Sequence, residues 1–475
     1  MPLFRPTFYA LLCLWSGFAL ATETADPFGT EASLPLKPAL RLGGAVGDPC
    51  AETMPGGALS LPEVVNLALC NNPQTREVWA SARVQAAQLG ASQGSYLPGV
   101  SVSASGNRNM PGGTNQRSIG LTVSYLLYDF GARAASVENA RQLLAAANAS
   151  QDSTVQQIFL AAVQSYYRTQ ATLTALDAAR EAERAAKQSH AAAEARYQAG
   201  SATPADKLQA QTAYSQATLN RISAEGNVKK TRGGLANLIG LDASHNVVLA
   251  DADTAAIPAD FEGDVNALIE EAKRQRPDLI AAEAQVKAAE ASAEGVRAAG
   301  KPSVSLSLSS NQSNNAGISS HGSSVGISVS VPLFSGYAPT YRVRAAEAQV
   351  EARQAQLERA RLQVALDVWN AYQDLLTATQ SLRASADLLH SAEQSERVAT
   401  GRYQAGVGSM LDVLGAQSAL ASARQQRIQS VLDWNISRAS LAQSMGDLDE
   451  NLLRTLSPAA PASLPISAAP TKDRP

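Results

Sequence analysis

The sequence predicts an α+β membrane protein built as a tandem repeat of one unit: a helix, a β-hairpin, a very long helix and a shorter helix. In Gly120–Arg141, apolar residues alternate with polar ones as in a strand, and at Asp129 the period changes to that of a helix. The same change occurs in Gly326–Gln349, where Ser335 and Gly336 make the turn. A strand that leads directly into a very long helix is uncommon, and this chain contains two.

A constant offset relates the two halves of the chain. Arg196–Gly200 (RYQAG) recurs as Arg402–Gly406, 206 positions later, and Asp206 recurs as Asp412 with the same offset. Upstream the offset is 204 and relates two dipeptides, Asn72-Pro73 and Arg276-Pro277. Such agreement over more than a hundred residues indicates an internal duplication.

The elements follow in order from these signals. Apolar and polar residues alternate at about 100–128 and 304–334, on either side of Gly-, Ser- and Asn-rich loops, and Asp129 with Gly131 makes the first strand-to-helix turn. The long helices extend for roughly 100 Å at 1.5 Å per residue, so they must pack against one another as coiled coils. The predicted segments are a signal peptide (1–21), an irregular segment (22–58), repeat 1 (59–240, tip near 198–206), a linker (241–263), repeat 2 (264–449, tip near 404–412) and a disordered tail (450–475).

The first residues predict export. Arg5 precedes a short apolar run, and Ala19-Leu20-Ala21 is a small-x-small cleavage site, so the run is a secretory signal rather than a membrane anchor. The formal net charge of −3 does not favour nucleic acid as a partner. Cys50 and Cys70 remain after cleavage and either pair in the oxidising compartment or stay as free buried thiols.

The strands indicate that the protein spans a membrane. Each is about ten residues long with one apolar and one serine-rich face, which is typical of transmembrane β-strands. Four strands cannot close a barrel, and open edges are not tolerated in lipid, so several copies must share one barrel. We expect an apolar face of Val123, Tyr125, Val304, Leu306, Ile327 and Val329. The alternative is a small soluble sandwich at the end of a helical rod.

We find no signature of an active site. Gly322–Gly326 fits G-x-S-x-G, but a serine-rich loop precedes it and a strand follows, whereas a nucleophile elbow needs a strand and then a helix. The four histidines are scattered and no phosphate-binding loop is present. We therefore predict neither enzymatic activity, nor a cofactor, nor a metal.

The two helical tips are the remaining candidate site. Asp206 and Asp412 each lie at the start of a helix, where a carboxylate is favoured by the helix dipole. That structural explanation is the simpler one. The functional alternative places them at the mouth of a conduit, with symmetry mates around it.

These residues together resemble the TolC family of outer-membrane efflux and secretion channels. The resemblance rests on the ordered set of strand–Asp-Phe-Gly–helix, Pro-Leu-Phe-Ser-Gly-Tyr, the two Arg-Tyr-Gln-Ala-Gly turns and Leu-Asp-Val-Leu, and it extends from about Leu59 to Asp449. It implies a homotrimer with a 12-stranded barrel continuing into a 12-helix coiled-coil periplasmic tunnel. The tips would then dock on a periplasmic adaptor and an inner-membrane transporter.

The resemblance also implies a gate at the tips. Asp206 and Tyr403 match positions of a lock that holds the tunnel closed, and Asp412 matches an aspartate of a constricting ring. We expect the Tyr403 hydroxyl to donate to the Asp206 carboxylate. Gly408 and Gly415 stand where studied members carry a lock arginine and a second ring aspartate, so we expect the closed state to be held less tightly.

The predicted function is the outer-membrane exit channel of a type I secretion system, in the outer membrane of a Gram-negative cell. Within the family the sequence is most similar to the component that serves a toxin of the RTX class. The partners would be an inner-membrane ABC transporter, an adaptor, a secreted protein and outer-membrane lipid. Two alternatives remain: a drug-efflux channel of the same fold, and a periplasmic coiled-coil structural protein without a barrel.

Overall fold

The computed structural model describes residues 26–34, 57–108, 110, 115–250, 264–315, 317–446 and 448. The predicted signal peptide, most of the irregular segment 22–58, residues 251–263 of the linker and the tail 450–475 lie outside these residues. Within the described part of the chain, no helix is both long and apolar enough to cross a bilayer.

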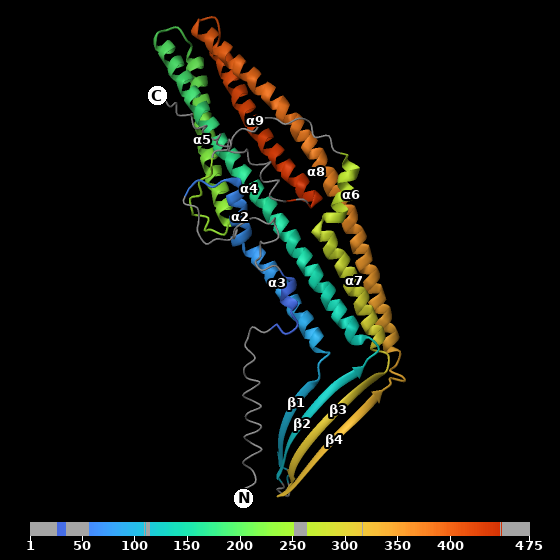
Figure 1. Ribbon diagram of the computed structural model, residues 1–475. Helices are drawn as coiled ribbons and strands as arrows, with labels where there is room; N and C mark the ends of the chain where they lie inside the picture. Colours follow the sequence, from blue (N-terminus) through green and yellow to red (C-terminus); the bar gives the residue numbers. More distant parts are fainter. Residues whose placement is uncertain are drawn as a thin grey trace, which may run out of the picture. The chain divides into compact units, whose positions relative to one another are not determined.

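Two matching sets of elements follow a short 3-10 helix, η1 (Thr30–Ser33) (Figure 1). The first set is α2 (Leu61–Asn71), α3 (Pro73–Gly94), β1 (Gly99–Arg108), β2 (Asn115–Tyr128), α4 (Ala132–Gln198) and α5 (Pro204–Leu238). The second is α6 (Val265–Gln275), α7 (Pro277–Ala298), β3 (Ser303–Asn315), β4 (Ile318–Ser330), α8 (Ala338–Gln404) and α9 (Met410–Met445). Both α4 and α8 have 67 residues, and both α3 and α7 have 22, which confirms the tandem repeat.

The chain divides into two compact units. The sheet unit contains Trp79–Ala149 and Ala281–Glu358, together with the described residues before Pro35. The helical unit contains Ser150–Ile280, Arg359–Pro475 and the segment that ends at Val78. The long helices α4 and α8 each contribute residues to both units.

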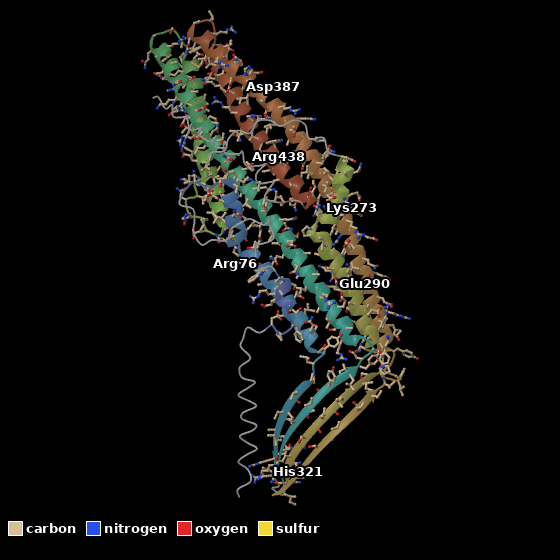
Figure 2. All side chains as sticks on the ribbon, in the orientation of Figure 1. Arg76, Lys273, Glu290, His321, Asp387 and Arg438 are labelled. Carbon is tan, nitrogen blue, oxygen red and sulfur yellow. The ribbon has the colours of Figure 1, made fainter. Side chains whose placement is uncertain are left out.

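The sheet unit holds one antiparallel sheet in the order β1-β2-β3-β4, so the hairpins of the two repeats pair through β2 and β3 (Figure 1). The strands are longer toward the hairpin ends than the sequence indicates. Part of the Gly-, Ser- and Asn-rich loop predicted within 304–334 is wrong, because Gln312 pairs with His321 and pairing continues to Ile318. Figure 2 shows His321 close to that end of the hairpin. Gly322–Gly326 therefore lies within β4 and forms no strand-to-helix elbow.

The strand register places the six predicted apolar positions on one face of the sheet. Val123 lies opposite Leu308, Tyr125 opposite Leu306, and Val304 opposite Val329. A bulge between Leu126 and Tyr128 brings Tyr128, rather than Leu127, onto that face opposite Val304.

The opposite face of the sheet carries hydroxyl groups that bond across strands. The Oγ atoms of Ser305 and Ser328 are 2.7 Å apart, and those of Ser309 and Ser324 are 2.8 Å apart. A row of serines continues across the remaining strands, since Ser105 bonds to Ser118 at 2.8 Å. The sheet thus has one apolar and one hydroxyl-bearing face.

The helical unit is held by thin packing between helices. Its main cluster contains Val64, Phe159 and Leu235, all buried, from α2, α4 and α5. Burial raises the pKa of Tyr167 to about 12 and lowers that of Arg438. The Arg438 guanidinium, labelled on α9 in Figure 2, lies 4.6 Å from the ring centroid of Trp434.

Candidate functional site at the helical tips

Asp129 builds the turn from β2 into α4. Its Oδ2 accepts from the backbone N–H of Arg133 at 2.8 Å and from Arg133 Nε at 3.1 Å, which caps the first turn of the helix. Burial raises the pKa of Asp129, but the hydrogen bonds from Arg133 and from the Gly131 N–H outweigh it, so that the pKa lies below its usual range. Gly131 has a φ of 96°, a conformation that favours glycine.

The turn from β4 to α8 uses different residues. Gly336 has a φ of 67° there, as predicted for a turn, and Tyr337 has a φ of 61°. The ring of Tyr337 lies edge-on to Phe334 at 5.6 Å, and both rings are exposed. Aromatic rings also flank the first turn, where Tyr128 and Phe130 are 4.7 Å apart.

The two tips of the helical unit have the same backbone geometry. At the end of α4, Ser201 N–H donates to Arg196 C=O and Gly200 adopts a φ of 71°. At the end of α8, Val407 N–H donates to Arg402 C=O and Gly406 adopts a φ of 79°. Both ends are Schellman motifs, which explains why the sequence repeats glycine at this position.

Both predicted tip aspartates belong to capping boxes. Asp206 Oδ2 accepts from the Thr203 backbone N–H at 3.0 Å, and Asp412 Oδ2 accepts from the Ser409 backbone N–H at 3.1 Å. Each aspartate N–H in turn donates to the hydroxyl of that Thr or Ser at 3.2 Å. The hydrogen bonds from the Ser409 backbone and side chain lower the pKa of the Asp412 carboxyl, and the charge of Arg402 adds to this. Both aspartates therefore have the structural role of capping the start of a helix.

The predicted hydrogen bond from Tyr403 to Asp206 is not formed. Among the described residues, the buried Tyr403 hydroxyl has no hydrogen-bond partner, and Asp206 Oδ2 accepts from the cap residue of its own helix. Arg196 from α4 makes the contact instead. Its guanidinium carbon lies 4.2 Å from the Tyr403 ring centroid, and its Nη2 donates to the carbonyls of Tyr403 at 2.9 Å and Gln404 at 3.3 Å.

Arg196 therefore joins the α4–α5 and α8–α9 hairpins within one chain. Figure 1 shows the tips of these two hairpins at the same end of the helices. It brings a cation to the carbonyl end of a helix, where the dipole favours positive charge. Below it, Gln417 Nε2 donates to Ser189 Oγ at 3.0 Å, and Arg424 pairs with Glu181 at 2.7 Å. Sequence reasoning noted Arg196 only as part of a repeated turn, and its stacking on Tyr403 was missed.

The two glycines that depart from the family pattern differ in their surroundings. A Cβ atom at Gly408 would lie 3.1 Å from both Arg402 Cβ and Tyr403 N, so a larger residue requires the turn to shift. A Cβ at Gly415 meets nothing within 4 Å. The tip is therefore packed around Gly408 and open at Gly415.

Three further points concern the predicted sites. Cys70 is disulfide-bonded, while Cys50 lies outside the described residues, so their pairing stays a prediction. Within the described ranges, no group of three or more His, Cys, Asp or Glu side chains could hold a metal. The roles of Asp206, Tyr403 and Asp412 as a gate also stay predictions.

Comparison with known proteins decides the family. A profile described as "Outer membrane efflux protein" matches residues 64–241 and 268–447, which are the two repeats. The chain belongs to this family. The chain is also similar to a protein named TolC, so the resemblance drawn from the tip and turn motifs is confirmed.

The curated relatives cover nearly the full length of this family member. The chain is 32% identical to Protein CyaE of Bordetella pertussis over 93% of its own length and 96% of that protein. It is 25% identical to the outer membrane protein TolC of Vibrio cholerae, over 83% of the chain and 92% of that protein. A probable efflux pump outer membrane protein of Pseudomonas putida, TtgC, is 26% identical over 82% of the chain and 83% of that protein.

Solved structures share the fold. The outer-membrane channel OprN aligns with a TM-score of 0.74 at 23% identity, covering 82% of this chain and 90% of that one. The open-state MtrE channel of Neisseria gonorrhoeae aligns with a TM-score of 0.70 at 22% identity, covering 82% and 89%. The protein is an outer-membrane channel of the efflux and secretion type.

Proposed function

We propose that three copies of the chain form the outer-membrane exit tunnel of a type I secretion system. An inner-membrane ABC transporter would drive a protein substrate, such as an RTX toxin, into the tunnel through a periplasmic adaptor docked on the tips. The channel itself supplies neither energy nor chemistry. We predict that it needs no cofactor.

The observation that supports a channel shared by several copies is that the sheet has two open edges. β1 and β4 are the outer strands of the four, so each presents a row of backbone groups that no strand in the described chain pairs. Lipid does not tolerate such edges, and about eight strands are the fewest that close a barrel. Three copies supply twelve strands, which agrees with what the family resemblance implies.

The faces of the sheet fit a membrane barrel. The apolar face runs from Tyr128 to Ile119, ten residues whose nine steps span roughly 30 Å along a strand at 3.3 Å per residue. A tilt of about 40° reduces this to roughly 23 Å, close to the 25 Å apolar band of outer-membrane barrels. Beyond Ile119 this face becomes polar, since Arg117 lies opposite Asn314.

Exposed aromatic rings mark one border of that band. Tyr128, Phe130, Phe334, Tyr337 and Tyr341 are all exposed and all lie where the strands meet the long helices. Aromatic girdles occupy this level in outer-membrane barrels because the rings prefer the lipid–water interface. The hydroxyl face, with pairs such as Ser305–Ser328, would then line the lumen.

The tips would form the periplasmic entrance. In a trimer, Asp412 comes close to its symmetry mates, and a ring of carboxylates attracts cations and narrows the opening. Arg196 and Tyr403 would hold neighbouring hairpins together in the closed state. Asp206 would act mainly by capping α5.

Secretion is preferred to drug efflux because the similarity to CyaE is higher and covers more of both chains than the similarity to TtgC. An efflux channel is the second candidate, since proteins named as efflux components share the same fold. A tunnel wall carries little information about its cargo, so the test must be functional.

The test is complementation. The chain is expressed in a Gram-negative strain that has the transporter and adaptor of a CyaE-containing system but lacks the outer-membrane component. We expect toxin in the medium and the protein in the outer-membrane fraction. Restored drug resistance without secreted toxin would favour the efflux function. A protein found only in the soluble periplasm would overturn the proposal that it forms a channel.

A further inference from the structure

The two helical hairpins of one chain meet through residues that the duplication has copied. Arg196 and Ser189 lie on one side of the α4–α5 hairpin, and they contact Tyr403, Gln404 and Gln417 of the α8–α9 hairpin. We call the first the arginine side and the second the tyrosine side. Because of the duplication, each hairpin carries both.

The arginine side of the α8–α9 hairpin is unused in the single chain. Its arginine is Arg402, the counterpart of Arg196, and its serine is Ser395, the counterpart of Ser189. Arg402 is exposed and its guanidinium makes no hydrogen bond or ion pair with another described residue, although its charge acts on Asp412. Ser395 is likewise exposed, and its hydroxyl has no hydrogen-bond partner in the described chain.

The tyrosine side of the α4–α5 hairpin is unused as well. Its members are Tyr197, Gln198 and Gln211, the counterparts of Tyr403, Gln404 and Gln417. Tyr197 is 40% exposed, whereas Tyr403 beneath Arg196 is 9% exposed. No side chain of the described residues donates to the carbonyls of Tyr197 or Gln198, and Gln211 is exposed without a hydrogen-bond partner among them.

One face of Tyr197 is already covered within its own hairpin. Lys207 Nζ lies 5.2 Å from the Tyr197 ring centroid and pairs with Glu194 at 2.8 Å. The counterpart of Lys207 is Val413, which packs in one buried cluster with Tyr403. The contact that Tyr197 lacks, relative to Tyr403, is therefore the guanidinium that comes from a neighbouring hairpin.

We propose that Arg402 of one protomer stacks on Tyr197 of a second copy of this chain and binds the carbonyls of Tyr197 and Gln198. Ser395 and Gln211 pair beside this contact, as Ser189 and Gln417 do within one chain. The proposal rests on the proposed tunnel and names the contacts that close it at the tips.

Geometry explains why this contact generates a ring. It joins unlike surfaces, so the contact can be repeated from copy to copy until the ring closes. In a trimer the tips then alternate between Arg196 contacts inside a chain and Arg402 contacts between chains, six in all. Arginine suits both because its planar guanidinium can stack on a ring while donating to carbonyl oxygens.

Cross-linking tests the position of Arg402. The variant with Arg402→Cys and Gln198→Cys is treated in outer membranes with a bismaleimide about as long as an arginine side chain. We expect covalent dimers and trimers on denaturing gels. The matched control, Arg196→Cys with Gln404→Cys, should react within one chain and stay at monomer mass, and each single variant controls for the native cysteines.

The outcomes separate this inference from the proposed tunnel. Native mass spectrometry of the wild-type protein in detergent gives the oligomeric state independently. A trimer in which the 402–198 pair gives no linked product, while the 196–404 pair reacts, overturns the Arg402 contact alone. A protein that is monomeric under these conditions overturns the contact and the trimeric tunnel together.

A second measurement tests the chemistry of the contact. Arg402→Met should raise single-channel conductance in planar bilayers, and Arg402→Lys should raise it less, because a charge remains at the helix end. Arg397→Met is the control, since Arg397 is also exposed on α8 but lies away from both sides. Equal conductance of the wild type and Arg402→Met, with trimers intact, would contradict the proposal.

Discussion

Arg276 donates from Nη1 to the carbonyl oxygen of Ser444, 168 positions further along the chain. Its counterpart in the first repeat, Asn72, donates from Nδ2 to the carbonyl of Leu238 at 3.3 Å. Each residue precedes a proline that begins a helix, and each carbonyl lies at the end of the returning helix. The duplication thus preserves a contact while the side chain that makes it has changed.

We predict that Arg276→Ala destabilises the helical unit by about 1–3 kcal/mol, because a buried guanidinium is removed from its partners. Those partners are Asp278 at 2.6 Å and Asp367 at 3.0 Å. Thermal unfolding followed by circular dichroism measures the effect. Arg274→Ala, which removes an exposed pair with Glu271, should cost less than about 1 kcal/mol, and equal losses would contradict the prediction.

A second prediction concerns the close approach of Gly240 to α2. Gly240 has a φ of 81°, and a Cβ there would lie 2.7 Å from Asn71 Cβ and 2.8 Å from Asn71 O. Gly200 has a φ of 71° but meets nothing within 4 Å. In both alanine variants the left-handed backbone lowers the free energy of unfolding by about 1–2 kcal/mol. The free energy of unfolding of Gly240→Ala should fall clearly further. Identical unfolding temperatures for the two variants would show that Asn71 moves aside freely.

The local pattern of the sequence predicted the elements but not their lateral contacts. The change of period at Asp129 placed the start of α4 correctly because each period is fixed by neighbouring residues. The contact of Arg196 with Tyr403 joins residues 207 positions apart, and no periodicity encodes it. The Tyr403–Asp206 bond was expected from the family resemblance, but the Tyr403 hydroxyl has no partner among the described residues and the Thr203 hydroxyl donates to Asp206 Oδ2 instead.

The strand ends were also predicted too short for a physical reason. Ser, Asn and Gly near His321 read as a loop, yet their backbone groups pair with β3 and their hydroxyls bond across strands, as Ser320 does with Ser313 at 2.8 Å. A loop and a strand rich in hydroxyl groups have similar amino-acid compositions. Pairing with the neighbouring strand decides between them.

The third prediction tests which face of the sheet meets lipid. Val329→Arg should cost more than Ser328→Arg, because an arginine on the lipid face costs between roughly 1 kcal/mol near the interface and 2–4 kcal/mol at the midplane, whereas one on the opposite face costs little. The amount of assembled trimer in outer membranes, on unheated gels, is the measurement. The two residues are adjacent on β4, so each serves as the control for the other. More trimer with Val329→Arg than with Ser328→Arg would reverse the assignment of faces.

The fourth prediction separates the ring of Tyr403 from its hydroxyl. Tyr403→Phe keeps the surface on which Arg196 stacks and removes only a hydroxyl without a partner, so single-channel conductance should not change. Tyr403→Ala and Arg196→Met should both raise it, because each removes the contact between hairpins. If Tyr403→Phe raised the conductance as much as Arg196→Met, the Tyr403 hydroxyl rather than its ring would hold the channel closed.

The last prediction is the pH dependence of the entrance. Hydrogen bonds from Ser409 lower the pKa of Asp412 from its ordinary value of 3.8, so this carboxylate stays ionised as the pH falls from 7 to 5. Because the folded-state pKa is the lower one, the capping contribution to stability is present above the unfolded pKa and is lost as the pH falls through the folded value.

Block of the channel by divalent cations from the periplasmic side should therefore be constant from pH 7 to 5. Asp412→Asn should weaken the block at every pH, while Asp387→Asn, at an exposed position of α8 that is 25 residues before Asp412, serves as a charge-matched control. A block as strong in Asp412→Asn as in the wild type would assign the cation site to a group other than Asp412.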